Sequence, residues 1–435
     1  MSHKHRRRNG ETEGEKMEKQ KLIKLLKVAK GEIKADTVIK NCKIIDVYSK
    51  EIIEGDIAIC DEFIAGIGNY DGENIIDAQG KYASPGFIDS HIHIESSCVS
   101  PEEMGRMIIP HGGTCIIADP HEIVNVCGMA GLKYMIEAGK KTPLDIKYMI
   151  PSCVPCTTFE NSGAIVDSKM MEEIILEKQV HGIGEFMDFL GILNCDDEIL
   201  NKILVAKKYN KIIDGHSPFM QGKDIDCYIG AGIKTDHECA SVEEMKTKIA
   251  RGMYIMLREG SACHDLRRLL KGVTEANSKR CILCSDDRQP ETMLNLGHLD
   301  NHLKICVEEG IDPITAIQMA TLNAAECYEL KDRGGIAPGL RADICLIKDL
   351  KDFKITNVFI EGKEIARDGK YLLKLEKISI DSVRKSVHVK DFSKDKLKTK
   401  LKSNKVNTIG IIPGGVITEK RVSLDRKSTR LNSSH

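Results

Sequence analysis

Between residues 85 and 333, short apolar runs that end in polar residues alternate with stretches of helical periodicity. Eight runs occur, and they end in turn at His91 and His93, Asp119, Pro151, Glu185, His216, His237, Arg258 and Asp286. Strands that alternate with helices build a parallel sheet, and eight of them close into a barrel. The sequence therefore predicts an α/β protein with a (β/α)₈ TIM-type barrel whose polar residues gather at the C-terminal strand ends.

The stretches between these runs carry helix-start signals. Helices are expected over residues 170–179, 199–209 and 265–276, and Ser241 with Glu244 resembles a capping box at the start of another. After the eighth run, residues 311–330 are predicted to form one further helix that begins at Asp312 and Pro313.

Segments on either side of the barrel have a different pattern. Residues 31–84 and 334–375 contain short β-rich runs broken by turn residues, which predicts one small β-sandwich built from both segments. Residues 1–30 are expected to be an extension that is disordered at its start. We expect residues 376–425 to begin an incomplete C-terminal region and residues 426–435 to be a non-native tail.

Charge and cysteine content limit the partners of the chain. Its 64 Lys and Arg nearly balance 65 Asp and Glu, which argues against nucleic acid or an anionic membrane and favours a small neutral molecule. Sixteen scattered cysteines, including the lone pairs Cys153/Cys156 and Cys281/Cys284, are expected to be structural thiols in a reducing compartment. With no apolar run of membrane-spanning length and no secretion signal at residues 1–21, a cytoplasmic protein is expected.

The strand-end residues include a set suited to metal binding. His91 and His93 are two apart, so on a strand both imidazoles point to the same face. Four imidazoles and two carboxylates at one barrel mouth could hold two divalent cations: His91, His93, Glu185, His216, His237 and Asp286. Asp286 alone could instead cap a helix. His298 and His302, four apart on one helical face, could form a second metal pair, but packing is the favoured interpretation.

Several strings in the chain resemble the amidohydrolase superfamily of metal-dependent hydrolases, and within it the adenine deaminase family. They cover residues 85–97, 119–125, 184–185, 214–216, 235–238 and 285–288. The resemblance implies an amidohydrolase-type barrel and hydrolytic deamination of adenine to hypoxanthine and ammonia, as in purine salvage. It also implies a homo-oligomer, expected to be a dimer. Adenine deaminases continue into another C-terminal region, whereas the native part of this chain is expected to stop just after Glu419.

Ligand roles follow from the resemblance. It implies that His91 and His93 bind one metal together with Asp286, that His216 and His237 bind the other, and that Glu185 bridges the two. The cations are expected to be Mn²⁺ or Fe²⁺, although the mixed nitrogen and oxygen shell also permits Zn²⁺. Asp286 and Glu185 are the expected catalytic residues, with Asp286 passing a proton from water toward the departing amine.

Polar residues near the ligands are candidates for reading the purine. These are Glu95, Asp119, His121, Glu122, Glu238 and Arg288, each of which could equally support a metal ligand. Two other functions stay open. The same barrel could hydrolyse a cyclic amide or imidazolone, because the metal ligands are shared and only the residues at the rim of the pocket determine the substrate. Alternatively, the chain could be a non-catalytic scaffold.

Overall fold

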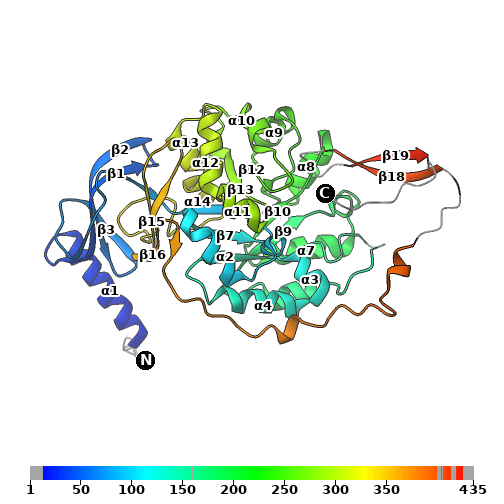
Figure 1. The fold of residues 1–435 in the computed structure, drawn as a ribbon, viewed down its shortest axis with the longest axis horizontal. Coiled ribbons are helices and arrows are strands. Elements are labelled where there is room, and N and C mark those ends of the chain that lie inside the picture. Colours follow the sequence, from blue (N-terminus) through cyan, green and yellow to red (C-terminus); the bar gives the residue numbers. More distant parts are fainter. Residues whose placement is uncertain (1–12, 158–159, 399–402, 404, 413–417, 425–435) are drawn as a thin grey trace, which may run out of the picture.

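The structure is a computed structural model that describes residues 13–157, 160–398, 403, 405–412 and 418–424 (Figure 1). The expectations for residues 1–12 and for the tail at residues 426–435 lie outside these ranges.

A parallel barrel forms the centre of the described chain. Five strands pair in the order β10-β9-β8-β7-β6, and three more pair in the order β11-β12-β13. Their bounds are β6 Phe87–Ile92, β7 Gly113–Ala118, β8 Asp145–Ile150, β9 Val180–Phe186, β10 Ile212–Gly215, β11 Thr235–Asp236, β12 Tyr254–Arg258 and β13 Cys281–Cys284. Each lies on one of the eight predicted apolar runs, so the predicted barrel is confirmed.

Backbone hydrogen bonds join the two sets of strands. After β13, the amide of Asp286 donates to the carbonyl of His91 at 2.9 Å, next to a parallel bridge between Asp286 and Ile92. On the other side, the amide of Lys234 donates to the carbonyl of Ile213 at 3.2 Å, which links the start of β11 to β10. The sheet therefore closes on itself.

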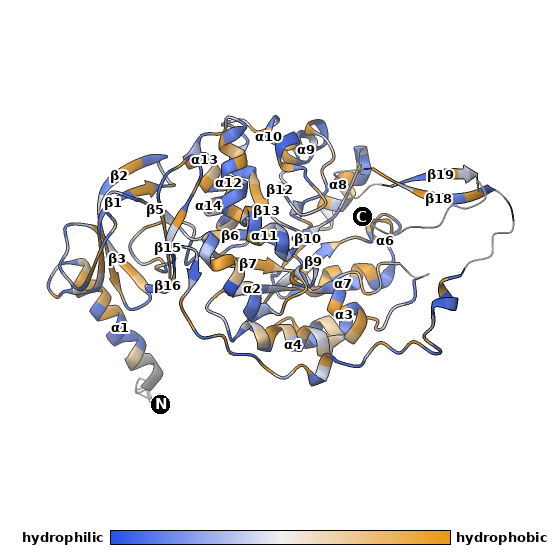
Figure 2. Ribbon diagram, in the orientation of Figure 1, coloured by the Kyte–Doolittle hydropathy of each residue, from blue (hydrophilic) through white to orange (hydrophobic). Residues whose placement is uncertain are grey.

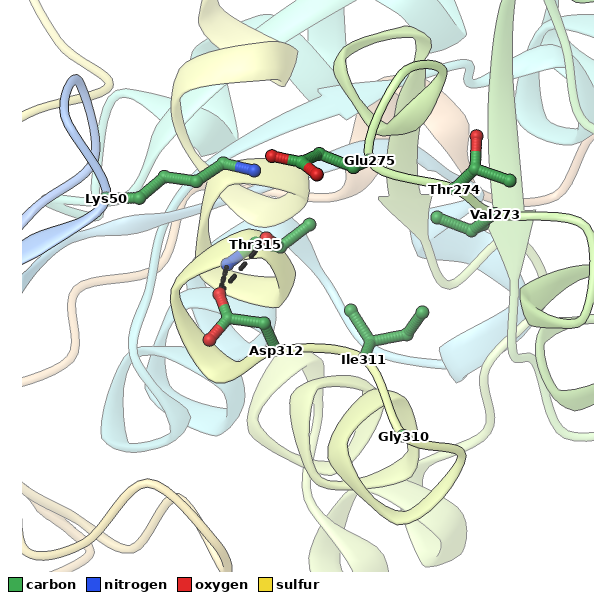
Figure 3. A pocket seen from close by; sticks show the side chains of 8 residues that line it. All are labelled: Lys50, Val273, Thr274, Glu275, Gly310, Ile311, Asp312 and Thr315. Atoms are coloured by element: carbon green, nitrogen blue, oxygen red, sulfur yellow. Dashed lines mark hydrogen bonds between the residues drawn. The ribbon is translucent and has the colours of Figure 1, made fainter.

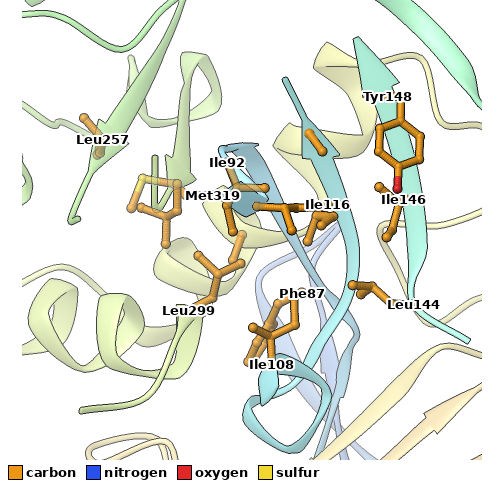
Figure 4. Close-up of a cluster of buried hydrophobic side chains, with 14 of the residues drawn as sticks. Phe87, Ile92, Ile108, Ile116, Leu144, Ile146, Tyr148, Leu257, Leu299 and Met319 are labelled. Carbon is orange, nitrogen blue, oxygen red and sulfur yellow. The ribbon is translucent and has the colours of Figure 1, made fainter. Parts of the chain in front are cut away.

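Alternation along the strands divides the apolar side chains between two layers. One set of strand residues forms a cluster with side chains of helix α14 (Leu322–Cys327). The strand residues of this cluster are Ile88, Cys115, Ile117, Met149, Ile212, Met256 and Ile282. The neighbouring positions, such as Ile116, Ile146 and Leu257, belong to a larger cluster that also includes helix residues Ile108 and Leu299 (Figure 4). Apolar segments consequently run through the strands, as the hydropathy colouring shows (Figure 2).

Helices surround the barrel: α2 Pro101–Ile108, α3 His121–Cys127, α4 Met129–Gly139, α5 Ser168–Ile174, α6 Phe189–Leu193, α7 Asp197–Lys208, α8 Gly222–Gly230, α9 Val242–Ile249, α10 Leu266–Leu270, α11 Pro290–Leu296 and α12 Leu299–Glu308. The capping residue predicted at Ser241 is confirmed, because its side chain accepts the amide of Glu244 and caps α9. Asp167 and Asp196 cap α5 and α7 in the same way, close to the starts expected at residues 170 and 199. The predicted helix at residues 265–276 is shorter, because α10 gives way to turns after Leu270.

The single helix predicted over residues 311–330 is wrong. Two helices occupy this stretch, α13 (Pro313–Ala320) and α14 (Leu322–Cys327). They separate at Thr321, whose φ of −137° and ψ of −86° lie outside the helical region. The Thr321 hydroxyl donates to the carbonyl of Ile317 at 2.7 Å, a local side-chain bond of the kind that bends helices.

Segments before and after the barrel share a second sheet. In the described chain it contains nine strands: β1 Ala35–Asp46, β2 Glu51–Cys60, β3 Phe63–Gly68, β4 Gly72–Asp77, β5 Tyr82–Pro85, β14 Ile344–Ile347, β15 Ile355–Ile360, β16 Lys363–Arg367 and β17 Lys370–Tyr371. Antiparallel pairing of β5 with β14 joins the two segments. Helix α1 (Glu13–Ala29) packs beside β2 and β3, held by ion pairs from Lys24 to Asp36 and Asp61.

Beyond β17 the described chain passes along the barrel helices, and its last described strands form a hairpin. Lys377 pairs with Glu103 of α2, and the thiol of Cys127 in α3 contacts the carbonyl of Val383. The hairpin of β18 (Lys405–Ile411) and β19 (Thr418–Leu424) projects away from the barrel (Figure 1). None of the helices in the described ranges has the length and apolar character needed to cross a membrane.

Candidate metal centre

His91 and His93 stand side by side at the end of the first barrel strand. His91 lies on β6, and His93 follows the strand and precedes the short 3₁₀ turn Ile94–Ser97. Both side chains are buried, and their ring centroids are 4.7 Å apart. The alternation of the strand thus brings two imidazoles to one face, as the His-x-His spacing predicts.

Glu185 lies between two groups of histidines. It is on β9, and one of its oxygens, Oε1, is 3.4 Å from Nε2 of His93. The other oxygen, Oε2, is 2.7 Å from Nδ1 of His216 and 3.1 Å from Nε2 of His237. His216 and His237 directly follow β10 and β11. A carboxylate with one oxygen toward each group has the arrangement needed to bridge two cations.

Asp286 completes the cluster from the last strand. Its Oδ1 is 3.2 Å from Nε2 of His93 and 3.7 Å from Nε2 of His91. The residue has a φ of +55°, in the left-handed region that Asp adopts more readily than most residues, and such conformations concentrate at functional sites. All six predicted ligands therefore converge at the C-terminal mouth of the barrel.

The donor atoms of this cluster fit cations. Neither ring nitrogen of His91, nor Nδ1 of His237, has a hydrogen-bond partner among the described residues, although both rings are buried. Burial, reinforced by the neighbouring His237 and His93, holds the pKa of His91 well below its ordinary value, so its ring is neutral and able to ligate. Four imidazoles and two carboxylates supply the mixed shell that two divalent transition-metal ions require.

Both carboxylates of the cluster are held in the ionised form. Burial by itself raises the pKa of Glu185, but the charge of His216 and hydrogen bonds from His121 and His216 outweigh it. For Asp286, burial acts in the same direction and is outweighed by the hydrogen bond from His93 and the charge of His237. The pKa of each carboxyl is therefore well below its ordinary value.

Asp119, a predicted rim residue, supports the ligands. Its backbone carbonyl lies 2.9 Å from Nδ1 of His93, which fixes that ring with Nε2 toward the cluster. Its carboxylate accepts the backbone amide of Glu185 at 2.9 Å. Burial raises the pKa of Asp119 to about 6.

Three more predicted rim residues stand on one side of the cluster. His121 has Nδ1 3.3 Å from Oε1 of Glu185, and Glu122 has Oε1 3.4 Å from Nδ1 of His93. Glu95 accepts the backbone amide of Ile123 through one oxygen, while the other is buried and unpaired within the described chain. Burial and the nearby Glu122 raise the pKa of Glu95 to about 8.

The last two rim candidates differ from each other. Glu238 has Oε1 3.5 Å from Nε2 of His237, so it borders the cluster. Arg288 is buried, and its guanidinium donates to the carbonyl of Gly297 at 2.8 and 3.2 Å and to that of Glu259 at 2.6 Å. It thus ties the loop after β13 to the loops around it.

Sequence reasoning missed Arg258 as a functional residue. It is the last residue of β12, and its buried guanidinium contacts Asp286 and Glu238. The sequence signal that could have identified Arg258 is its place at the end of the seventh apolar run, where the other strand-end candidates lie.

Groups that the sequence favoured as packing residues have structural partners. His298 contacts Asp89 at 2.8 Å, and His302 contacts the carbonyls of His298 and Cys284.

A surface cavity of about 460 Å³ shares no lining residue with the cluster (Figure 3). In it, the Asp312 carboxylate accepts the amide of Thr315 and caps α13.

Residues 82–365 match the model of the amidohydrolase family, so the chain belongs to that family. Solved structures agree on the fold. An enamidase with 18% identity gives a TM-score of 0.57 over 77% of this chain and 96% of its own. An atrazine chlorohydrolase from Arthrobacter aurescens, solved with zinc, has 15% identity and a TM-score of 0.58 over 78% of this chain and 97% of its own.

Curated sequences narrow the assignment. Adenine deaminase 2 of Desulfotalea psychrophila is 58% identical over 413 residues, which is 95% of this chain and 72% of the relative. Adenine deaminase of Ligilactobacillus salivarius is 53% identical over 94% of this chain and 71% of its own length. The chain therefore belongs to the adenine deaminase family.

Proposed function

We propose that this chain catalyses the hydrolytic deamination of adenine to hypoxanthine and ammonia at a binuclear metal site. The observation that carries the proposal is the position of Glu185, with one oxygen toward His93 and the other toward His216 and His237. Identity of 58% to an adenine deaminase supports adenine as the substrate. Nearly balanced charge suits a small neutral molecule.

Residues for the two cations follow from the contacts. His91, His93 and Asp286 would hold one ion, His216 and His237 the other, and Glu185 both. When bound, such a pair lowers the pKa of a water molecule and so supplies hydroxide near neutral pH. Mn²⁺ or Fe²⁺ is our proposal for the ions, and the nitrogen and oxygen donors also suit Zn²⁺.

Asp286 is the proposed general base and acid. Water contributes its oxygen to C6 of the ring and one proton to Asp286, which carries that proton to the exocyclic nitrogen. The C6–N bond breaks, ammonia leaves, and the second water proton ends on N1 of hypoxanthine. Since Asp286 is buried and its Oδ1 faces the imidazoles, it is placed to move a proton within the cluster.

Glu95, Glu122 and His121 are the rim residues that we propose to read the purine edge. Glu95 supports this role because its pKa of about 8 allows a protonated carboxyl, which can donate to a ring nitrogen. Purine salvage, a cytoplasmic location and a dimer stay predictions.

The products decide between substrates. The chain, loaded with Mn²⁺, should release ammonia from adenine and leave the rings of dihydropyrimidines and imidazolones intact, with His91→Ala as the metal-binding control. Hydrolysis of these cyclic compounds opens the ring without releasing ammonia, so ring-opened product from them with no ammonia from adenine would replace the proposal with the alternative hydrolase. A protein that binds no transition metal and is unaffected by His91→Ala would favour a scaffold.

A further inference from the structure

Arg258 places one buried guanidinium among three carboxylates. The side chain is 2% exposed. Its Nε and Nη2 donate to Oδ2 of Asp265 at 3.0 and 2.7 Å. Nη1 and Nη2 donate to the two oxygens of Glu238, and Nη1 also donates to Oδ2 of Asp286 at 2.7 Å. These contacts use all five N–H groups that a guanidinium has.

The two oxygens of Asp286 have different neighbours as a result. Oδ2 accepts from Arg258, whereas Oδ1 faces His93 and His91 at 3.2 and 3.7 Å. Backbone bonds to His91 and His93 fix the main chain of Asp286 but do not set the plane of its carboxylate. Without the guanidinium, the carboxylate would lose the contact that holds Oδ2, and its plane could rotate away from the imidazoles.

Arg258 also links the two halves of the cluster. Glu238, which shares the guanidinium, has Oε1 3.5 Å from Nε2 of His237 and 3.8 Å from Nδ1 of His216. Asp265 accepts from Nε and Nη2 of the guanidinium and makes no hydrogen bond or ion pair with the six ligands within the described chain. It also pairs with Arg268. The planar, two-pronged geometry of Arg suits this task, and a Lys ammonium could not reproduce it.

We propose that Arg258 is a positioning residue that locks the side chain of Asp286 with Oδ1 toward His91 and His93, and that Asp265 anchors it. The inference rests on the proposed function for its catalytic consequence, but the orientation of Asp286 can be measured without turnover. Groups that orient metal ligands typically contribute 10- to 100-fold to affinity or activity.

The test compares Arg258→Lys and Asp265→Asn with a matched control, Arg333→Lys. Arg333 is also buried and pairs with Asp145 and Asp332. Asp145 begins β8, so this pair lies at the opposite end of the barrel from the ligands. Each protein is loaded with Co²⁺, and its metal content and visible absorption, which reports coordination geometry, are measured. The kcat and KM for adenine are then measured on Mn²⁺-loaded protein.

Arg258→Lys should keep its metal content, change the Co²⁺ spectrum, and lower kcat about 10- to 100-fold with KM altered less than about threefold. Asp265→Asn should show the same changes to a smaller degree, and Arg333→Lys neither. A wild-type spectrum and kcat in Arg258→Lys would overturn the inference, as would complete loss of metal. If wild-type protein binds Co²⁺ without deaminating adenine, the proposed function fails while the spectra still decide the role of Arg258.

Discussion

Replacing Lys248 with Met should destabilise the fold and weaken metal binding, because this buried lysine holds two buried carboxylates. Lys248 lies on α9 and is fully buried. Its ammonium donates to the carbonyl of Ser217 at 2.7 Å, to Oδ2 of Asp236 at 2.9 Å and to Oε1 of Glu244 at 2.8 Å. Ser217 follows His216 and Asp236 precedes His237, so one ammonium holds both loops that carry these ligands.

The cost follows from the charges left behind. Lys248→Met removes the cation from two buried carboxylates, and breaking a buried ion pair costs about 3–5 kcal/mol. Asp236 keeps hydrogen bonds from the amide and hydroxyl of Ser217 at 2.7 and 2.9 Å, which places the expected loss near 3 kcal/mol. Burial raises the pKa of Asp236, but Lys248, together with the charge of His237 and the hydrogen bond from Ser217, outweighs burial and brings the pKa to about 2.

The control is Lys202→Met. Lys202 is also buried, but its ammonium donates to the carbonyl of Ser152 at 2.9 Å and forms no ion pair with a carboxylate among the described residues. Losing such a bond costs about 1–3 kcal/mol. Thermal unfolding should therefore give a midpoint several degrees lower for Lys248→Met than for Lys202→Met, together with weaker Mn²⁺ binding in the former alone. Equal midpoints and equal Mn²⁺ affinities would refute the reasoning.

Three further predictions concern pH, a helix cap and the metal. Burial raises the pKa of Asp145, but Arg333 and Lys147 outweigh it and bring the pKa from 3.8 to about 2. This carboxylate thus contributes about 2 kcal/mol above pH 4, a contribution that disappears as the pH falls toward 2, and Asp145→Asn should lose it in denaturation measured across that range. Ser241→Ala, which removes the acceptor for the amide of Glu244, should cost about 1 kcal/mol, whereas Ser241→Asp should keep most of it. Mn²⁺ at 100 times its dissociation constant should raise stability by about 2.7 kcal/mol, and calorimetry should find no such gain after chelation or in His91→Ala.

Residues whose positions follow from strand periodicity could be predicted from the sequence. His91 and His93 lie on one face because side chains alternate along a strand, and Glu185, His216 and Asp286 each end an apolar run. A closed barrel brings all such ends to one mouth. The break between α13 and α14 at Thr321 could not be predicted, because the apolar pattern continues through it. The feature that accompanies the break is a hydrogen bond from the Thr321 hydroxyl to the carbonyl of Ile317, which sequence periodicity does not record.

Contacts between side chains that are distant in sequence also could not be predicted from the sequence. Arg258 meets Asp286 and Glu238 only because three different strands close side by side, and no spacing in the sequence records that contact. The same limit applies to the predicted rim residue Arg288, whose bonds to the backbone carbonyls of Glu259 and Gly297 no sequence spacing indicates. A strand end tells which residues reach the mouth of a barrel, whereas the direction of a long side chain depends on which carboxylates or carbonyls surround it there. The backbone brings a short side chain such as Asp286 to the mouth of the barrel, so the convergence of the six residues was predictable. The side-chain contacts made there, such as that of Asp286 with Arg258, were not.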